Sequence, residues 1–282
     1  MASGKRKILK VTAIVLAVIL SIVAVLCLCG EIATRVCDRW NPWRPNYDAI
    51  SEQELTLLLN KETLTSQDYQ LLYEQTGLTQ IGIDRLIAKE QKNEIINIHR
   101  DYFANYKVID ERFAPFTCWE KINGIVGLVA LEPGDIILTS ATHVLGFRYG
   151  HSALVVNENE VIESFAVGSR SDVTMASMIQ DYASFMVLKP KVSEQTKTQI
   201  VEYALDELMG LPYSLTTGIL SKKNQKNPNR THCAHLVWRA FKQFGIDLDS
   251  NGGKIVKPQD IANSPYLEVV QIYGFHPEKL WK

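Results

Sequence analysis

An apolar run close to the N-terminus constrains the fold of this chain more than any other feature. The segment from Val11 to Cys29 contains no charged residue. A helix of this length, at ~1.5 Å per residue, covers most of the ~30 Å hydrocarbon core of a bilayer. We therefore expect a transmembrane helix over residues 11–30, with most of the chain on one side of the membrane.

The residues that flank this run predict its orientation. Basic residues precede it and an acidic residue follows it, namely Lys5, Arg6, Lys7, Lys10 and Glu31. Because basic flanks remain in the cytoplasm, residues 1–10 are expected to form a short cytoplasmic segment, and the chain after residue 30 is expected to be extracytoplasmic. The expected location is the cell membrane, which the chain crosses once.

A cleaved signal peptide is the alternative interpretation of the same run. The apolar part of a signal peptide is usually shorter, and a cleavage site of small residues follows it. Here the run ends in Leu26-Cys27-Leu28-Cys29, which fits such a site poorly. An uncleaved anchor is therefore the preferred interpretation.

The net charge and the cysteine content exclude several classes of function for the rest of the chain. The formal net charge is −1 over 282 residues, and no strong basic patch suggests binding to nucleic acid. Five cysteines are too few for a disulfide scaffold. A bridge between Cys37 and Cys118 stays open, because sequence alone does not define pairing. No Cys/His spacing of the zinc type occurs, so we expect neither a metal nor a cofactor.

Residues 31–127 show helical patterning. Ser51 and Thr65 each look like an N-terminal cap ahead of an apolar stretch. A third helix is expected over residues 81–98, with a continuation toward Lys107. We interpret this stretch as a juxtamembrane helical region that packs on the following domain or stands between that domain and the membrane. None of its residues shows a spacing typical of catalysis.

A short predicted helix near the C-terminal end carries a thiol in its first turn. Apolar residues recur at helical spacing behind Cys233, and Gly245 ends the pattern. Thr231 is expected to be the N-cap. The unpaired amides and the positive end of the helix dipole favour an anion at Cys233, which lowers a thiol pKa and favours the nucleophilic thiolate. A buried structural cysteine is the alternative.

Two predicted strands bring a histidine near a glutamate. The strand over residues 150–156 carries His151, and the return strand over residues 160–165 carries Glu163. A three-residue loop, with Asn159 in the left-handed region, pairs residue 156 with residue 160 and places the two side chains diagonally on one face, ~7–8 Å apart. A two-residue turn places them on opposite faces. A solvated Glu163 is the alternative, and the apolar pattern leaves both open.

Three segments, in this order along the chain, carry a resemblance to one family. They are Pro133-Gly134-Asp135-Ile136-Ile137-Leu138, then Gly150-His151-Ser152-Ala153-Leu154-Val155-Val156 with Val161-Ile162-Glu163-Ser164, and last Cys233-Ala234-His235-Leu236-Val237-Trp238-Arg239-Ala240-Phe241. Residues 128–282 resemble the YiiX-like permuted papain-like amidases, relatives of the NlpC-type cell-wall peptidases. In the permuted group the cysteine helix follows the histidine, as it does here.

The resemblance implies a fold and a set of site residues. The fold is α+β: an antiparallel sheet with a catalytic cysteine helix over residues 128–282, preceded by the transmembrane helix and the helical region. Matched to the family's motif, Cys233 is the nucleophile, His151 is the base and Glu163 is the residue that orients the histidine.

Three other titratable residues lie near these motifs in the sequence. His232 and His235 are rival bases, but neither is expected to bend back from the same helix turn to face Cys233. Asp135 is expected to bond its own backbone as a turn residue rather than to act as a catalytic acid.

These features predict a membrane-anchored, extracytoplasmic cysteine hydrolase that cleaves an amide or peptide bond. Its expected partners are the membrane, through residues 11–30, and a peptide or amide substrate; peptidoglycan fits the expected location. An acyltransferase or thioesterase that acts on lipid acyl groups with the same three residues is one alternative. A non-catalytic binding module on the same fold is another.

Overall fold

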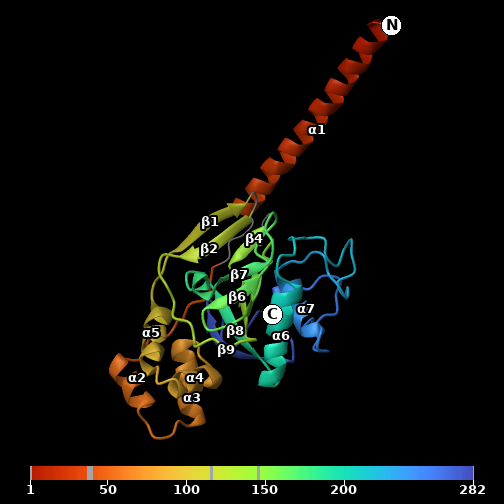
Figure 1. Ribbon diagram of the computed structural model, residues 1–282. Helices are drawn as coiled ribbons and strands as arrows, with labels where there is room; N and C mark the ends of the chain where they lie inside the picture. Colours follow the sequence, from red (N-terminus) through yellow and green to blue (C-terminus); the bar gives the residue numbers. More distant parts are fainter. Residues whose placement is uncertain (1, 37–40, 115–116, 145–146, 282) are drawn as a thin grey trace.

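The computed structural model describes residues 2–36, 41–114, 117–144 and 147–281. Helix α1 (Ala2–Val36) extends away from the rest of the chain as a single rod (Figure 1). Within it, Lys10–Ile32 is long and apolar enough to cross a membrane, by length and composition, and its most apolar part is exposed. The helix expected over residues 11–30 is therefore part of a longer one.

Four short helices follow, and their ends show why they form where they do. They are α2 (Glu52–Leu59), α3 (Ser66–Thr76), α4 (Gln80–Ala88) and α5 (Lys92–Phe103). Ser51 and Thr65 cap α2 and α3 as expected, each in a reciprocal capping box. The single helix expected over residues 81–98 is wrong. It breaks at Glu90, the backbone φ of which is 59°, and Gln91 donates to the Leu86 carbonyl to close the end of α4.

A small sheet occupies a stretch for which helix was expected. Strands β1 (Val108–Ala114), β2 (Thr117–Ile122) and β4 (Thr142–Val144) pair antiparallel in the order β1-β2-β4. The β-branched and aromatic residues of β1 and β2 favour strand, and Pro115 between them prevents a continuous helix. The region over residues 31–127 is thus helical only in its first part.

Among the described residues, the main sheet has six strands, all paired antiparallel in the order β7-β6-β5-β3-β8-β9. These are β3 (Ile136–Thr139), β5 (His151–Val155), β6 (Glu160–Glu163), β7 (Asp172–Met175), β8 (Phe185–Pro190) and β9 (Leu267–Tyr273). The structure is therefore mixed α and β with antiparallel sheets, as expected.

One face of the main sheet is covered by the C-terminal helices. These are α6 (Glu194–Glu207), α7 (Cys233–Lys242) and α8 (Pro258–Ala262). Leu154 and Ile162, from the two central hairpin strands, share a buried cluster with Ile200 of α6 and Leu236 of α7. This packing holds the first turn of α7 against β5, which positions the site described below.

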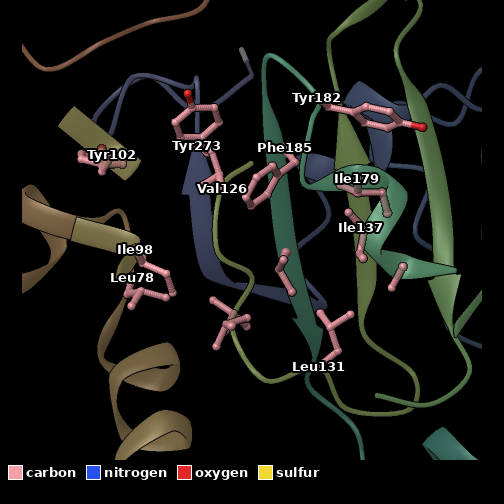
Figure 2. Packing of buried hydrophobic residues seen from close by; sticks show 14 of the residues in the cluster. Leu78, Ile98, Tyr102, Val126, Leu131, Ile137, Ile179, Tyr182, Phe185 and Tyr273 are labelled. Carbon is pink, nitrogen blue, oxygen red and sulfur yellow. The ribbon is translucent and has the colours of Figure 1, made fainter. Parts of the chain in front are cut away.

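The opposite face packs against the N-terminal helices. Figure 2 shows Leu78 and Ile98, from the helical region, next to each other, and they belong to the same buried cluster as Phe185 of β8 and Ile137 of β3. Burial of this much apolar surface is the main favourable term in folding. The chain division expected at residues 127 and 128 remains a prediction, and the hydrophobic core crosses it.

Candidate active site

Helix α7 begins at Cys233, at the position that the sequence predicts. The N-cap, however, is His232: its Nδ1 accepts from the backbone N–H of His235 at 3.3 Å. The expectation that Thr231 caps this helix is wrong, because the Thr231 hydroxyl bonds the His235 imidazole at 2.9 Å instead. The Cys233 side chain is buried at the start of the helix, where unpaired amides favour an anion.

The hairpin of β5 and β6 has the register expected from a three-residue loop. Ala153 pairs with Glu163, and the Val156 N–H donates to the Glu160 carbonyl at 2.8 Å. Asn159 does not adopt the left-handed conformation expected for it. Instead the Asn157 carboxamide oxygen accepts from the Asn159 N–H at 2.9 Å, and this side-chain turn closes the loop.

This register brings His151 and Glu163 into direct contact. The Nε2–H of His151 donates to Glu163 Oε2 at 2.5 Å, and the Thr174 hydroxyl donates to Glu163 Oε1 at 2.6 Å. Both side chains are buried. Burial opposes ionisation of Glu163, but the bonds from His151 and Thr174 outweigh it and lower the pKa of this carboxyl.

Cys233 is the third buried residue of this cluster and interacts with His151. Burial raises the pKa of the Cys233 thiol, but its interactions with His151 and His232 outweigh this and lower the pKa to about 5. Burial likewise opposes the charged imidazole, but Cys233 and Glu163 raise the pKa of His151 to about 10. Between these values the arrangement favours a thiolate and an imidazolium side by side.

The two other histidines near Cys233 differ in position. His232 helps to lower the pKa of the Cys233 thiol, while its Nδ1 accepts from the His235 N–H at 3.3 Å as the N-cap of α7. His235 points elsewhere: its Nε2–H donates to the Lys223 carbonyl at 2.8 Å. Burial lowers the pKa of His235 to about 4, so this imidazole is neutral and serves the packing of α7.

Aromatic side chains that the motifs do not include form a wall of the site. Trp119 of β2 packs edge-on against the His151 ring, with centroids 5.3 Å apart, and stacks on Phe165 at 4.8 Å. Trp119 precedes residue 128, where the resemblance begins. Its contact with His151 depends on pairing between distant segments, and no local pattern in the sequence indicates it.

The other cysteines lie apart from this cluster. Cys118 is a free, buried thiol on β2, and burial raises its pKa to about 11. Cys37, the partner considered for it, lies outside the described residues. Within the part of the chain that the structure describes, no group of three or more His, Cys, Asp or Glu side chains is arranged to hold a metal ion.

Comparison with known proteins identifies a family for the C-terminal half of the chain. The family model for permuted papain-like amidase enzymes of the YaeF/YiiX type, the C92 family, matches residues 130–282. The chain is also similar to the uncharacterized protein YycO of Bacillus subtilis (strain 168). The two are 30% identical over 193 residues, which cover 65% of this chain and 76% of YycO. That stretch is longer than the family match, so it includes residues before position 130.

Proposed function

The chain belongs to the permuted papain-like amidase family, and on this premise we propose that it is a membrane-anchored cysteine hydrolase that cleaves an amide bond through Cys233, His151 and Glu163. The observation that carries the proposal is the buried cluster of these three residues, in which His151 bonds Glu163 at 2.5 Å and the interaction of Cys233 with His151 lowers the pKa of the thiol and raises that of the imidazole. A nucleophile, a base and a residue that orients the base are the three parts that such catalysis requires.

The geometry supports a two-stage reaction. The Cys233 thiolate attacks the amide carbon, and the imidazolium of His151 gives its proton to the leaving amine as the C–N bond breaks. The remaining acyl group is a thioester on Cys233. A water molecule then attacks this thioester, His151 accepts the water proton, and the acid leaves as the C–S bond breaks. In this scheme the backbone N–H of Cys233, at the start of α7, stabilises the oxyanion in both stages.

Glu163 orients the base in this scheme. Its carboxylate holds Nε2–H of His151, which leaves Nδ1 to face the thiol. The bond from Thr174 fixes the carboxylate in turn. Trp119 and Phe165 cover the imidazole with apolar surface, and low polarity strengthens the hydrogen bond between His151 and Glu163.

We further propose that α1 anchors the enzyme in the cell membrane with the catalytic residues outside the cytoplasm. The apolar span Lys10–Ile32 and the basic residues before it support this orientation. Peptidoglycan peptides are amide substrates found in that location. Release of new amino groups from isolated muropeptides, with the Cys233→Ala protein as the blank, tests this substrate class.

Alkylation by iodoacetamide tests the proposed nucleophile independently of any substrate. Its rate follows the thiolate fraction, so labelling of Cys233 is expected to rise with pH through a midpoint near 5 and to level off above about pH 6. Cys118 is the internal control, because burial raises its pKa to about 11 and it is expected to stay unlabelled. Intact mass with peptide mapping assigns each adduct. A midpoint typical of a free thiol contradicts the proposal.

Acyl transfer is a second candidate, and exposed apolar side chains beside the site favour it. Leu215 and Ile219, on the loop before α7, and Phe147, on the loop before β5, are each more than half exposed. With a phospholipid or acyl-thioester donor, such an enzyme is expected to gain the mass of one acyl group on Cys233. An amidase specific for peptides is expected to show no adduct with either donor.

A further inference from the structure

Three loops meet near Cys233. The loop before α7 leads into the site, because the Ser214 N–H donates to the Thr231 carbonyl at 2.7 Å, two residues before Cys233. The same loop meets the one after β6, since the Tyr213 N–H donates to the Ser169 carbonyl at 3.0 Å. Burial raises the pKa of Tyr213, and its nearness to Cys233 and to Tyr149, on the loop before β5, raises it further.

These loops carry a concentration of exposed apolar side chains. We call this set the apolar rim: Phe147, Tyr149, Val167, Leu215, Ile219 and Leu220. Each is at least half exposed, and Leu220 reaches 81%. Single exposed apolar residues are ordinary on soluble proteins, but a group on adjoining loops marks an interaction surface.

Basic side chains accompany the apolar rim. Lys222, Lys226 and Arg230 lie on the same segment as Leu220 and are exposed. A surface that mixes apolar and basic residues is typical of segments that lie in the interface of an anionic bilayer. The charge therefore indicates a lipid surface as the partner rather than an apolar protein face.

The apolar rim lies at the end of the molecule from which α1 departs. Glu31, near the end of α1, pairs with Arg112 of β1 at 2.6 Å. Across the small sheet, β2 pairs with β4, and Val144 at the end of β4 exchanges backbone hydrogen bonds with Phe147. Figure 1 shows α1 leaving from the end of the molecule that carries β1, β2 and β4, with α2 and α3 at the opposite end.

We propose that the apolar rim rests on the surface of the membrane that α1 enters, so that Cys233 opens toward the lipid headgroups. The inference rests on the anchoring role of α1 in the proposed function and adds the substrate class. The amide or ester bond that reaches Cys233 belongs to an amphiphile held in the bilayer. Side chains of such a surface insert ~5–10 Å into the headgroup boundary, deep enough for Leu220 to meet acyl chains.

Fluorescence quenching by lipid tests this contact in the full chain. The five cysteines of the chain are first replaced by alanine. In this background a single cysteine is introduced by Leu220→Cys, Leu57→Cys or Ile22→Cys. Each variant is then labelled at that cysteine with a polarity-sensitive dye. The protein is reconstituted into vesicles of phosphatidylcholine and phosphatidylglycerol with a lipid-borne quencher. Leu57 on α2 is the matched control, because it is 71% exposed but lies far from α1. Ile22 reports whether α1 is inserted.

The label at position 220 is expected to shift to shorter wavelength and to lose about half of its emission to the quencher, while the label at position 57 is unchanged. Removal of phosphatidylglycerol, or the changes Lys222→Gln and Lys226→Gln, is expected to weaken this quenching.

Equal emission at positions 220 and 57, with position 22 quenched, overturns the membrane contact while the anchor stands. A blue shift at position 220 without lipid quenching also overturns it and indicates that protein covers the apolar rim. An unquenched label at position 22 shows that α1 is not inserted, which overturns the anchor and this inference together. The proposed nucleophile is tested separately, by alkylation of Cys233 in the wild-type chain.

Discussion

The change His151→Ala is expected to slow alkylation of Cys233 at pH 7 about a hundredfold and to lower amide turnover about 10⁴-fold or more. The wild-type thiol is almost fully ionised at this pH, because its pKa is about 5. Without the imidazolium, burial dominates and raises the pKa of Cys233 toward or above its ordinary value. The thiolate fraction at neutral pH then falls to about one in a hundred. Turnover falls further, because proton transfer to the leaving amine is lost as well.

Two variants separate the roles of charge and geometry in this prediction. Glu163→Gln keeps a side chain of the same length beside His151 but removes the charge that supports the imidazolium. Its alkylation midpoint is expected to lie between those of the wild type and His151→Ala. His99→Gln serves as the matched control, since His99 is buried in the helical region and bonds Gln75 instead. If His151→Ala retains a midpoint near pH 5, then His232 and the dipole of α7 hold the thiolate, and the assignment of His151 as base is wrong.

The parts of the site that could be predicted from sequence depend on short-range geometry. The spacing between His151 and Glu163 and the length of the loop between their strands determine the register, and the structure has the expected pairing of Ala153 with Glu163. The position of Cys233 at the start of α7 follows equally from the apolar periodicity behind it. The conformation of Asn159 could not be predicted, because either the left-handed backbone or the Asn157 side chain closes such a loop.

Features that depend on contacts between distant segments were not predictable. Trp119 meets His151 only because β2 pairs with β4 and lies over the site. The choice of His232 over Thr231 as N-cap depends on His235, which offers the Thr231 hydroxyl a better partner. The hairpin of β1 and β2 lies in the stretch predicted as a helical region, and its pairing was not foreseen because tertiary contacts decide the structure of such short segments.

Asp135 illustrates a prediction that was correct and incomplete. It accepts from the Glu132 N–H at 3.0 Å, as expected for a turn aspartate. The structure adds a bidentate ion pair with Arg85 of α4, at 2.6 and 3.1 Å, and places the carboxylate out of contact with solvent. This pair joins the helical region to the first strand of the main sheet, which no local pattern indicates.

The change Arg85→Met is expected to lower the free energy of unfolding by about 3–5 kcal/mol, because it leaves the Asp135 carboxylate buried without its partner. Burial already raises the pKa of Asp135, and Arg85 opposes that shift. In the variant the pKa rises further, so the buried group resists ionisation while the unfolded one ionises freely. The loss of stability is therefore expected to grow as the pH rises above the ordinary range of an aspartate and to shrink in acid. Urea unfolding of the full chain in detergent, followed by tryptophan fluorescence, measures both effects.

A second substitution shows whether the unpaired charge is the cause. Arg85→Met combined with Asp135→Asn removes the charge but keeps an acceptor for the Glu132 N–H, so it is expected to recover most of the lost stability and to abolish its pH dependence. Arg100→Met is the matched surface control, because its pair with Glu52 is exposed on both sides and is expected to contribute little. If the helical region and the main sheet fold as one unit, the single variant shifts one cooperative transition. Two separate transitions in Arg85→Met instead indicate that the helical region unfolds on its own and that the pair with Asp135 does not couple it to the sheet.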